Sequence, residues 1–351
     1  MLILFLLLSC GVVPTTLNNN IQKGKPVISR NNNNTTITPK DNNNLLCGQS
    51  PPRRLAFVWY LANSMGYPCA ILASVQKLRT DLELPHCIET VVIYNSNMGL
   101  KLESSEMATT IAKLNASGLV TRFYGFDDIP QTHADSKHRQ YYHGVLTKLS
   151  IFRLSDYDRI LFMDADTYPL MPLHFLLLGL PGGSSSSDTA AANSSTNLDF
   201  WAIRPSWLPS PEQQICSVLL ILRPCPSIYQ QIQERYFITA PTNNSTATTT
   251  TTTTREVEMY DMNILQDFFR WDQQVGLLPG SLLVLDGSVE AQQQQQRSSR
   301  IFENAALLHF SIKKPWHRDT RHLYLDARLN VLHKEWKRFV KPYCPDLKTL
   351  T

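Results

Sequence analysis

The sequence predicts an α/β protein built on a doubly wound, mostly parallel β-sheet of the Rossmann-like kind. Apolar runs of strand length alternate with segments of helical spacing between residues 54 and 166. This βαβαβαβ order favours parallel pairing, because a helix returns the chain to the start of the next strand. The last apolar run ends in two acidic residues, Asp164 and Asp166. Ligands of such sheets bind beyond the carboxyl ends of the strands, where this pair stands.

The individual elements follow from the local pattern. The strands are continuous apolar runs, as expected for a sheet covered on both faces. The helices show helical spacing, with Pro68 at the start of one and Gly118 at the end of another. In chain order we expect a strand at 54–62, a helix at 68–80, a strand at 89–95, a helix at 103–118, a strand at 119–126, an amphipathic helix at 143–157 and a strand at 158–166.

The chain also predicts its own division into segments. Residues 1–13, MLILFLLLSCGVV, are too short an apolar run for a comfortable membrane span and have the length of a secretory signal. We expect a signal peptide or a short signal-anchor there. Residues 14–53 are rich in Asn, Thr and Pro and predict a low-complexity stem. A single domain at 54–343 is expected to follow, with low-complexity loops inserted at 182–197, 242–254 and 291–297.

Composition favours an exported protein and argues against nucleic acid as a partner. The 33 basic and 29 acidic residues leave a formal net charge of only +4. Without Cys10 of the leader, six cysteines remain, an even number that permits disulfides in any of 15 pairings. No C-x-x-C pair occurs, so a structural zinc site is not expected. Asn115 begins a glycosylation sequon outside the biased tracts. The six cysteines are Cys47, Cys69, Cys87, Cys216, Cys225 and Cys344.

Asp164 and Asp166 are the strongest candidates for a functional site. Two carboxylates one residue apart at a strand end can offer four oxygens to Mg²⁺ or Mn²⁺, which would share its other positions with phosphate and water. An Asp-x-Asp triplet alone is common and often lies in a solvated turn. The buried run ILFM before this one favours a metal or catalytic site.

Two chemistries fit this motif. The phrase ILFMDADT also resembles the motif of haloacid-dehalogenase-like phosphatases, in which Asp164 would attack phosphorus and Asp166 would act as acid and base. That family places its motif near the start of the domain and needs a second acidic pair on a later strand end. Here residues 54–163 precede the motif, and the later segment VLDGS at 284–288 offers a single Asp. The phosphatase therefore stays the weaker alternative.

Four blocks, in order, resemble glycosyltransferase family 8, the glycogenin-like group, in its Golgi and fungal-type form. They are AFVWYLANSMGYPCAILASVQKLR (56–79), TKLSIFRLSDYDRILFMDADTYPL (147–170), YDMNILQDFF (260–269) and HFSIKKPWH (309–317). The resemblance implies a GT-A fold with Asp-x-Asp at a strand end. It also implies a UDP-sugar-dependent, hexosyltransferase-type enzyme that uses Mn²⁺ (or Mg²⁺) and transfers sugar to a glycan or protein acceptor with retention. The expected place is the Golgi lumen, with the protein secreted or type II anchored and in contact with the membrane only through the N-terminal segment.

The resemblance assigns a role to individual residues. It implies metal binding by Asp164, Asp166 and His309, and catalytic roles for Asp261 and Lys148. Without it, His309 would be read as a core residue, Lys148 as an exposed helix lysine and Asp261 as a helix N-cap. The residues implied to bind the nucleotide-sugar and its metal are Leu61, Ala62, Asn63, Tyr67, Lys148, Asp164, Ala165, Asp166, Ser217 and Lys314.

The chain departs from the family pattern around the donor sugar. The family's Asn-Ser-Gly is Cys216-Ser217-Val218 here, and Met262 replaces the Gln that often follows the acceptor-side Asp. The identities of sugar and acceptor are therefore not carried over. A non-catalytic relative that only binds a sugar or a sugar nucleotide is a third alternative.

Overall fold

The computed structural model describes the greater part of residues 53–345, and the chain separates into two units, Met1–Arg53 and Arg54–Thr351. The predicted leader, the stem up to residue 52 and the loops at 182–197 and 242–254 lie outside the described residues. Within the described part, no helix has both the length and the apolar character needed to cross a membrane. The described residues are 53–62, 66–96, 104–127, 129, 144–179, 199–205, 214–237, 260–269, 275–294, 302–316, 324 and 326–345.

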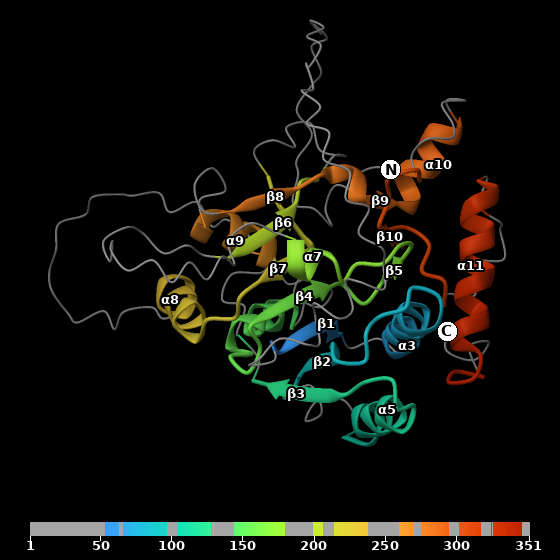
Figure 1. Ribbon diagram of the computed structural model, residues 1–351. Helices are drawn as coiled ribbons and strands as arrows, with labels where there is room; N and C mark the ends of the chain where they lie inside the picture. The colour runs from blue at the N-terminus through green and yellow to red at the C-terminus, as the bar shows by residue number, and fades with distance from the viewer. Residues whose placement is uncertain are drawn as a thin grey trace, which may run out of the picture. The chain divides into compact units, whose positions relative to one another are not determined.

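The domain is organised around a seven-stranded sheet in the order β3-β2-β1-β4-β7-β6-β8 (Figure 1). β3, β2, β1 and β4 are parallel to their neighbours, β7 is antiparallel to β4 and β6, and β8 is parallel to β6. The predicted mostly parallel α/β sheet is therefore confirmed. The strands are β1 Leu55–Leu61, β2 Glu89–Asn95, β3 Arg122–Phe126, β4 Arg159–Met163, β6 Phe200–Ile203, β7 Cys216–Leu222 and β8 Gly276–Leu278.

Helices cover both faces of this sheet, and Figure 1 shows α3 and α5 on one side and α8 on the other. Every residue of β1 is buried, which explains its unbroken apolar sequence. Val58 and Phe162 belong to a core shared with η1, α8 and α9, in which Phe200 stacks on Phe269 with ring centroids 4.2 Å apart. The helices are α3 Gly66–Thr80, α5 Ser104–Ala116, η1 Val145–Arg153, α7 Leu176–Gly179, α8 Pro226–Tyr236, α9 Asp261–Phe269, η3 Gly280–Leu282, α10 Asp286–Gln294 and α11 Ala327–Val340.

Three local expectations differ from the structure. The predicted helix at 143–157 is the shorter 3₁₀ helix η1, which begins after Gly144 in a left-handed conformation at φ 81°. The predicted strand at 158–166 ends at Met163, so the two aspartates lie in a turn rather than on the strand. The glutamine-rich tract expected as a loop at 291–297 begins inside α10.

A second, three-stranded sheet lies beyond the carboxyl end of β4. It joins β5 (Thr167–Pro169), β10 (Leu307–His309) and β9 (Leu283–Leu285). β10 is antiparallel to β5 and parallel to β9, and its register sets His309 opposite Thr167. The small sheet thus brings the C-terminal part of the chain beside the acidic turn.

A disulfide fixes the C-terminal helix to the first helix of the domain. Cys69 in α3 is bonded to Cys344 just after α11, across 275 residues of sequence. Cys87 is also disulfide-bonded, whereas Cys225 is a free thiol. The sequence left 15 complete pairings of six cysteines open; the structure assigns the Cys69–Cys344 bond and leaves Cys225 as a thiol.

Candidate functional site

The acidic turn is held by backbone contacts to two neighbouring strands. The amide of Asp164 donates to the carbonyl of Val218 in β7 at 3.0 Å, and the carbonyl of Asp164 accepts from the hydroxyl of Thr167 at 2.6 Å. The carbonyl of Asp166 accepts from the amide of Phe310 at 3.0 Å. The turn is therefore anchored to the main sheet on one side and to the small sheet on the other.

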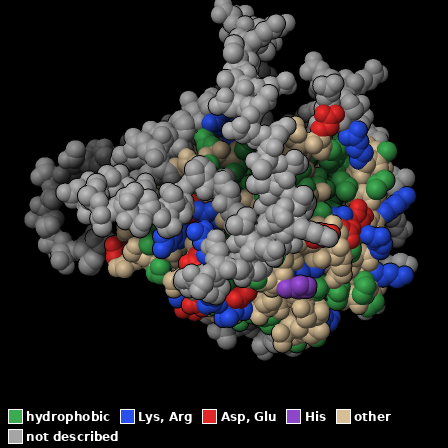
Figure 2. Space-filling view, viewed as in Figure 1, with side chains coloured by type: hydrophobic (Ala, Val, Ile, Leu, Met, Phe, Trp, Pro, Cys, Tyr) green, Lys and Arg blue, Asp and Glu red, His purple; other side chains and the backbone are tan. Residues whose placement is uncertain are grey.

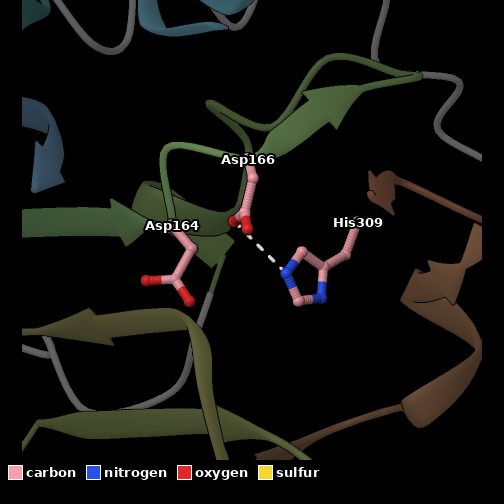
Figure 3. A group of neighbouring side chains, drawn as sticks. All are labelled: Asp164, Asp166 and His309. Carbon is pink, nitrogen blue, oxygen red and sulfur yellow. Dashed lines mark ion pairs between the residues drawn. The ribbon is translucent and has the colours of Figure 1, made fainter. Parts of the chain in front are cut away.

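Asp164, Asp166 and His309 converge at this point (Figure 3). One ligand atom from each lies within 4.8 Å of the others. Asp166 Oδ1 is 3.2 Å from Nε2 of His309, and His309 Nδ1 is buried without a hydrogen-bond partner among the described residues. Two carboxylates and an imidazole form a donor set that suits Mn²⁺. The three residues therefore fit the metal that the sequence predicted.

Lys148 joins the cluster from η1. Its Nζ lies 2.6 Å from Asp164 Oδ1 and 3.6 Å from Asp261 Oδ2. Burial opposes the charge on Lys148, but the two carboxylates outweigh it and hold the pKa of Lys148 above its usual range. Burial raises the pKa of Asp164, an effect that Lys148 opposes and the nearby charge of Asp166 reinforces. Lys148 is thus a buried cation facing two acids, not an exposed helix lysine.

Lys314 approaches from the opposite side. Its Nζ lies 2.5 Å from Asp166 Oδ2 and also contacts the carbonyl of Phe310. Burial alone would raise the pKa of Asp166, but interaction with Lys314 and His309 lowers it below the usual range. The side chain of Asp166 is therefore an anion with a partner on each carboxylate oxygen.

Asp261 stands at the start of α9 and is only 6% exposed. Its Oδ2 is buried and accepts no hydrogen bond from the described residues, but it lies 3.6 Å from the Nζ of Lys148. The alternative role as a helix cap does not account for this oxygen. The structure places Asp261 beside the same lysine as Asp164, which joins the start of α9 to the acidic turn.

The remaining predicted residues lie at the edges of this cluster. Leu61 is buried at the end of β1, Ala62 follows it half-buried, and Asn63 lies outside the described residues. Ala165 is buried in the acidic turn. Ser217 is buried in β7 beside Val218, whose carbonyl holds the Asp164 amide.

Tyr67, predicted to contact the nucleotide, packs on the C-terminal motif. Its ring centroid lies 5.2 Å from that of Trp316. A side chain on Gly66 would place its first carbon 2.0 Å from the Trp316 ring, so the close approach of α3 requires glycine there. The structure therefore joins the block at 56–79, predicted to bind the nucleotide, directly to the KPW block.

The sequence did not reveal the role of Asp286. It marked this residue only as a single acid in a possible second phosphatase motif. In the structure, Asp286 is fully buried and accepts hydrogen bonds from the backbone of Ser311 to Lys313. Its carboxylate is occupied by these donors and forms no second acidic pair.

Figure 2 shows side chains of both charge signs interspersed over the visible face.

No protein-family model matches the chain. No curated protein matches its sequence.

Similar solved structures do exist. The bifunctional glycosyltransferase WbbM in its apo form has a TM-score of 0.52 at 12% identity, over 85% of this chain and 52% of its own. The galactosyltransferase LgtC with donor and acceptor sugar analogues gives 0.49 at 13% identity, over 82% and 95%. Mouse xyloside xylosyltransferase 1 gives 0.40 at 12% identity, over 75% and 99%. This chain spans about half the length of WbbM. At these identities the likeness establishes the fold, which is GT-A, as predicted.

Proposed function

We propose that the chain is a metal-dependent glycosyltransferase that transfers a sugar from a UDP-sugar to a glycan or protein acceptor. The proposal is carried by one observation, the convergence of Asp164, Asp166 and His309 between the ammonium groups of Lys148 and Lys314. The GT-A fold and the four family-8-like blocks support it. We further propose that the chain belongs to the glycogenin-like family and that transfer retains the anomeric configuration.

Each part of the cluster has a separate task in this reaction. Asp164, Asp166 and His309 would hold Mn²⁺ (or Mg²⁺), which supplies positive charge to the departing diphosphate. Lys314 adds a second cation on that side, so leaving-group charge meets preorganised donors in a buried site. Lys148 and Asp261 are assigned to the reacting sugar and the acceptor hydroxyl, because they face each other beside Asp164.

The uridine is assigned to the block after β1. Leu61, Ala62, Asn63 and Tyr67 would hold it, with Ser217 on the donor-sugar side and Ala165 supplying backbone between the two acids. The ring of Tyr67 contacts Trp316, which follows Lys314 by two residues, so this block lies next to the segment that carries Lys314. The nucleotide and its diphosphate would then be bound by parts of the chain that already touch.

The two alternatives make different demands. A phosphatase needs a second acidic pair on a later strand end, yet Asp286 is bound by backbone amides and is not available as a second acid. The GT-A fold does not favour that chemistry either. A non-catalytic relative would bind the sugar nucleotide at the same site without transferring the sugar. Only a measurement of turnover therefore separates it from an enzyme.

A screen of nucleotide sugars tests the proposal. With Mn²⁺ present, we expect UDP release from at least one UDP-sugar, lost on addition of EDTA and restored by excess Mn²⁺. The same assay with ADP- and GDP-sugars serves as the control. Binding of UDP-sugar in calorimetry without turnover would favour the non-catalytic relative. Absence of both binding and turnover across the panel would overturn the proposal.

We also propose that the protein works in the secretory pathway, in the Golgi lumen, secreted or type II anchored. The Cys69–Cys344 and Cys87 disulfides support an oxidising compartment. Asn115 supports it as well, because it is exposed in the last turn of α5, where an attached glycan meets no core residue.

Glycosylation of Asn115 is the expected consequence. In protein made by a secreting eukaryotic cell, mass spectrometry should find an N-glycan on the peptide that carries Asn115. Ser117→Ala should remove it, and Ser117→Thr, which keeps the acceptor motif, should retain it. Unmodified Asn115 in all three proteins would contradict a lumenal location.

A further inference from the structure

Asp286 is a buried carboxylate whose hydrogen-bond donors are mostly backbone amides. It has 0% exposure and lies where β9 passes into α10. Its Oδ1 accepts from the amides of Gly287 (2.8 Å), Ser311 (2.8 Å) and Ile312 (3.0 Å), and from the Ser311 hydroxyl (2.7 Å). Its Oδ2 accepts from the amide of Lys313 at 3.0 Å. The carboxylate therefore binds three successive amides of one segment.

That segment connects two parts of the candidate site. Ser311 to Lys313 are three of the four residues between His309, where β10 ends, and Lys314. His309 and Lys314 both contact Asp166, on different carboxylate oxygens. The distance and direction between these two side chains thus depend on a short turn, and Asp286 is the group that the turn wraps around.

A second layer holds the same turn from behind. The hydroxyl of Tyr324 lies 3.4 Å from Asp286 Oδ2 and donates to the carbonyl of Lys313 at 3.0 Å. A ring nitrogen of His333 in α11 lies 3.2 Å from the carbonyl of Pro315. The backbone on both sides of Lys314 is therefore held by hydrogen bonds.

The charge on Asp286 matters as well as its shape. A buried carboxylate is tolerated when several N–H groups satisfy it, since hydrogen bonds to a charged acceptor are stronger than neutral ones. The ion pairs assigned within the described residues include none to Asp286, so its charge is stabilised by its hydrogen-bond donors, chiefly the backbone amides. Loss of the charge would weaken all of these bonds together.

We infer that Asp286 is a positioning residue, which sets His309 and Lys314 in the geometry that binds metal and diphosphate together. This inference rests on the proposed function. Asp286 acts through the turn and touches neither the cation nor the substrate. It follows that a neutral residue of the same size should loosen metal binding while the fold persists.

The test is Asp286→Asn, with the affinity for Mn²⁺ and the KM for the UDP-sugar as readouts. An amide can keep its oxygen toward Ser311 and Ile312, but its NH₂ then faces the amide of Lys313 and that hydrogen bond is lost. We expect the Mn²⁺ dissociation constant, measured by titration calorimetry or spin resonance, to rise about 10- to 100-fold. The KM should rise with it, and kcat at saturating Mn²⁺ and donor should change less.

The control is Asp199→Asn, which breaks the buried ion pair with Arg159 at the far end of β4. It should lower the melting temperature without changing the Mn²⁺ dissociation constant. If Asp286→Asn fails to fold, Ser311→Ala removes one hydrogen bond to the same carboxylate and should weaken Mn²⁺ binding in the same direction, by less. Wild-type affinity in a folded Asp286→Asn protein, or equal weakening by Asp199→Asn, would overturn the inference. A wild-type protein that binds neither Mn²⁺ nor UDP-sugar would overturn the proposed function itself.

Discussion

Replacing Asp166 by Asn should lower UDP-sugar turnover roughly a thousandfold, the scale seen when a preorganised electrostatic contact is removed. Asp166 contacts both a proposed metal ligand and a lysine: its Oδ1 lies 3.2 Å from His309 and its Oδ2 lies 2.5 Å from Lys314. An amide of the same shape removes the anion that both groups face. The metal would lose a charged ligand, and Lys314 would lose the partner that orients it.

The measurement is UDP release at several Mn²⁺ concentrations, with circular dichroism to verify the fold. Excess Mn²⁺ should recover little of the rate, because the missing charge is part of the site. Asp267→Asn is the matched control, since this acid lies in α9 as an exposed partner of Arg235. Turnover within a few-fold of wild type in Asp166→Asn would contradict the assignment of the metal site, whereas Asp267→Asn should behave as wild type.

Replacing Cys344 by Ser should lower the free energy of unfolding by about 2–5 kcal/mol. The Cys69–Cys344 bond closes a loop of 275 residues in sequence, and loop closure restricts the unfolded chain more as the loop grows. The bond also ties α11 to α3, between which Trp316 and Trp336 pack with ring centroids 6.2 Å apart. The C-terminal helix should therefore loosen first.

Urea denaturation followed by tryptophan fluorescence measures this effect, because Trp316 and Trp336 lie in the affected core. Cys225→Ser is the control, since Cys225 is a free, half-buried thiol at the start of α8. It should shift the denaturation midpoint little. Equal midpoints for wild type and Cys344→Ser would show that the bond adds nothing to stability, and an equal loss in Cys225→Ser would point to a general effect of removing sulfur.

The parallel half of the fold could be predicted because its elements are long and locally patterned. β1, β2 and β4 are continuous apolar runs, and each is followed or preceded by a helical segment of clear spacing. β8 and β9 have only three residues each, too few to show a period. The small sheet and the antiparallel pairing of β7 arise from contacts far apart in sequence, which local patterns do not encode.

The candidate site divides in the same way. Asp164 and Asp166 could be predicted from the strand before them, because the ends of parallel strands are where ligands bind. Lys148, His309 and Lys314 look ordinary in their own surroundings and were identified by resemblance alone. Asp286 could not be predicted because its main partners are backbone amides of residues 311–313, and every residue except proline has such an amide whatever its side chain.

The Cys69–Cys344 bond also has a consequence for biosynthesis. Cys69 is made early and its partner comes 275 residues later, so nearly the whole domain must leave the ribosome before the bond can form. A chain that stops short of Cys344 lacks the partner that Cys69 in α3 needs for this bond. The Cys69–Cys344 bond therefore marks a chain in which His309 and Lys314 have already been made.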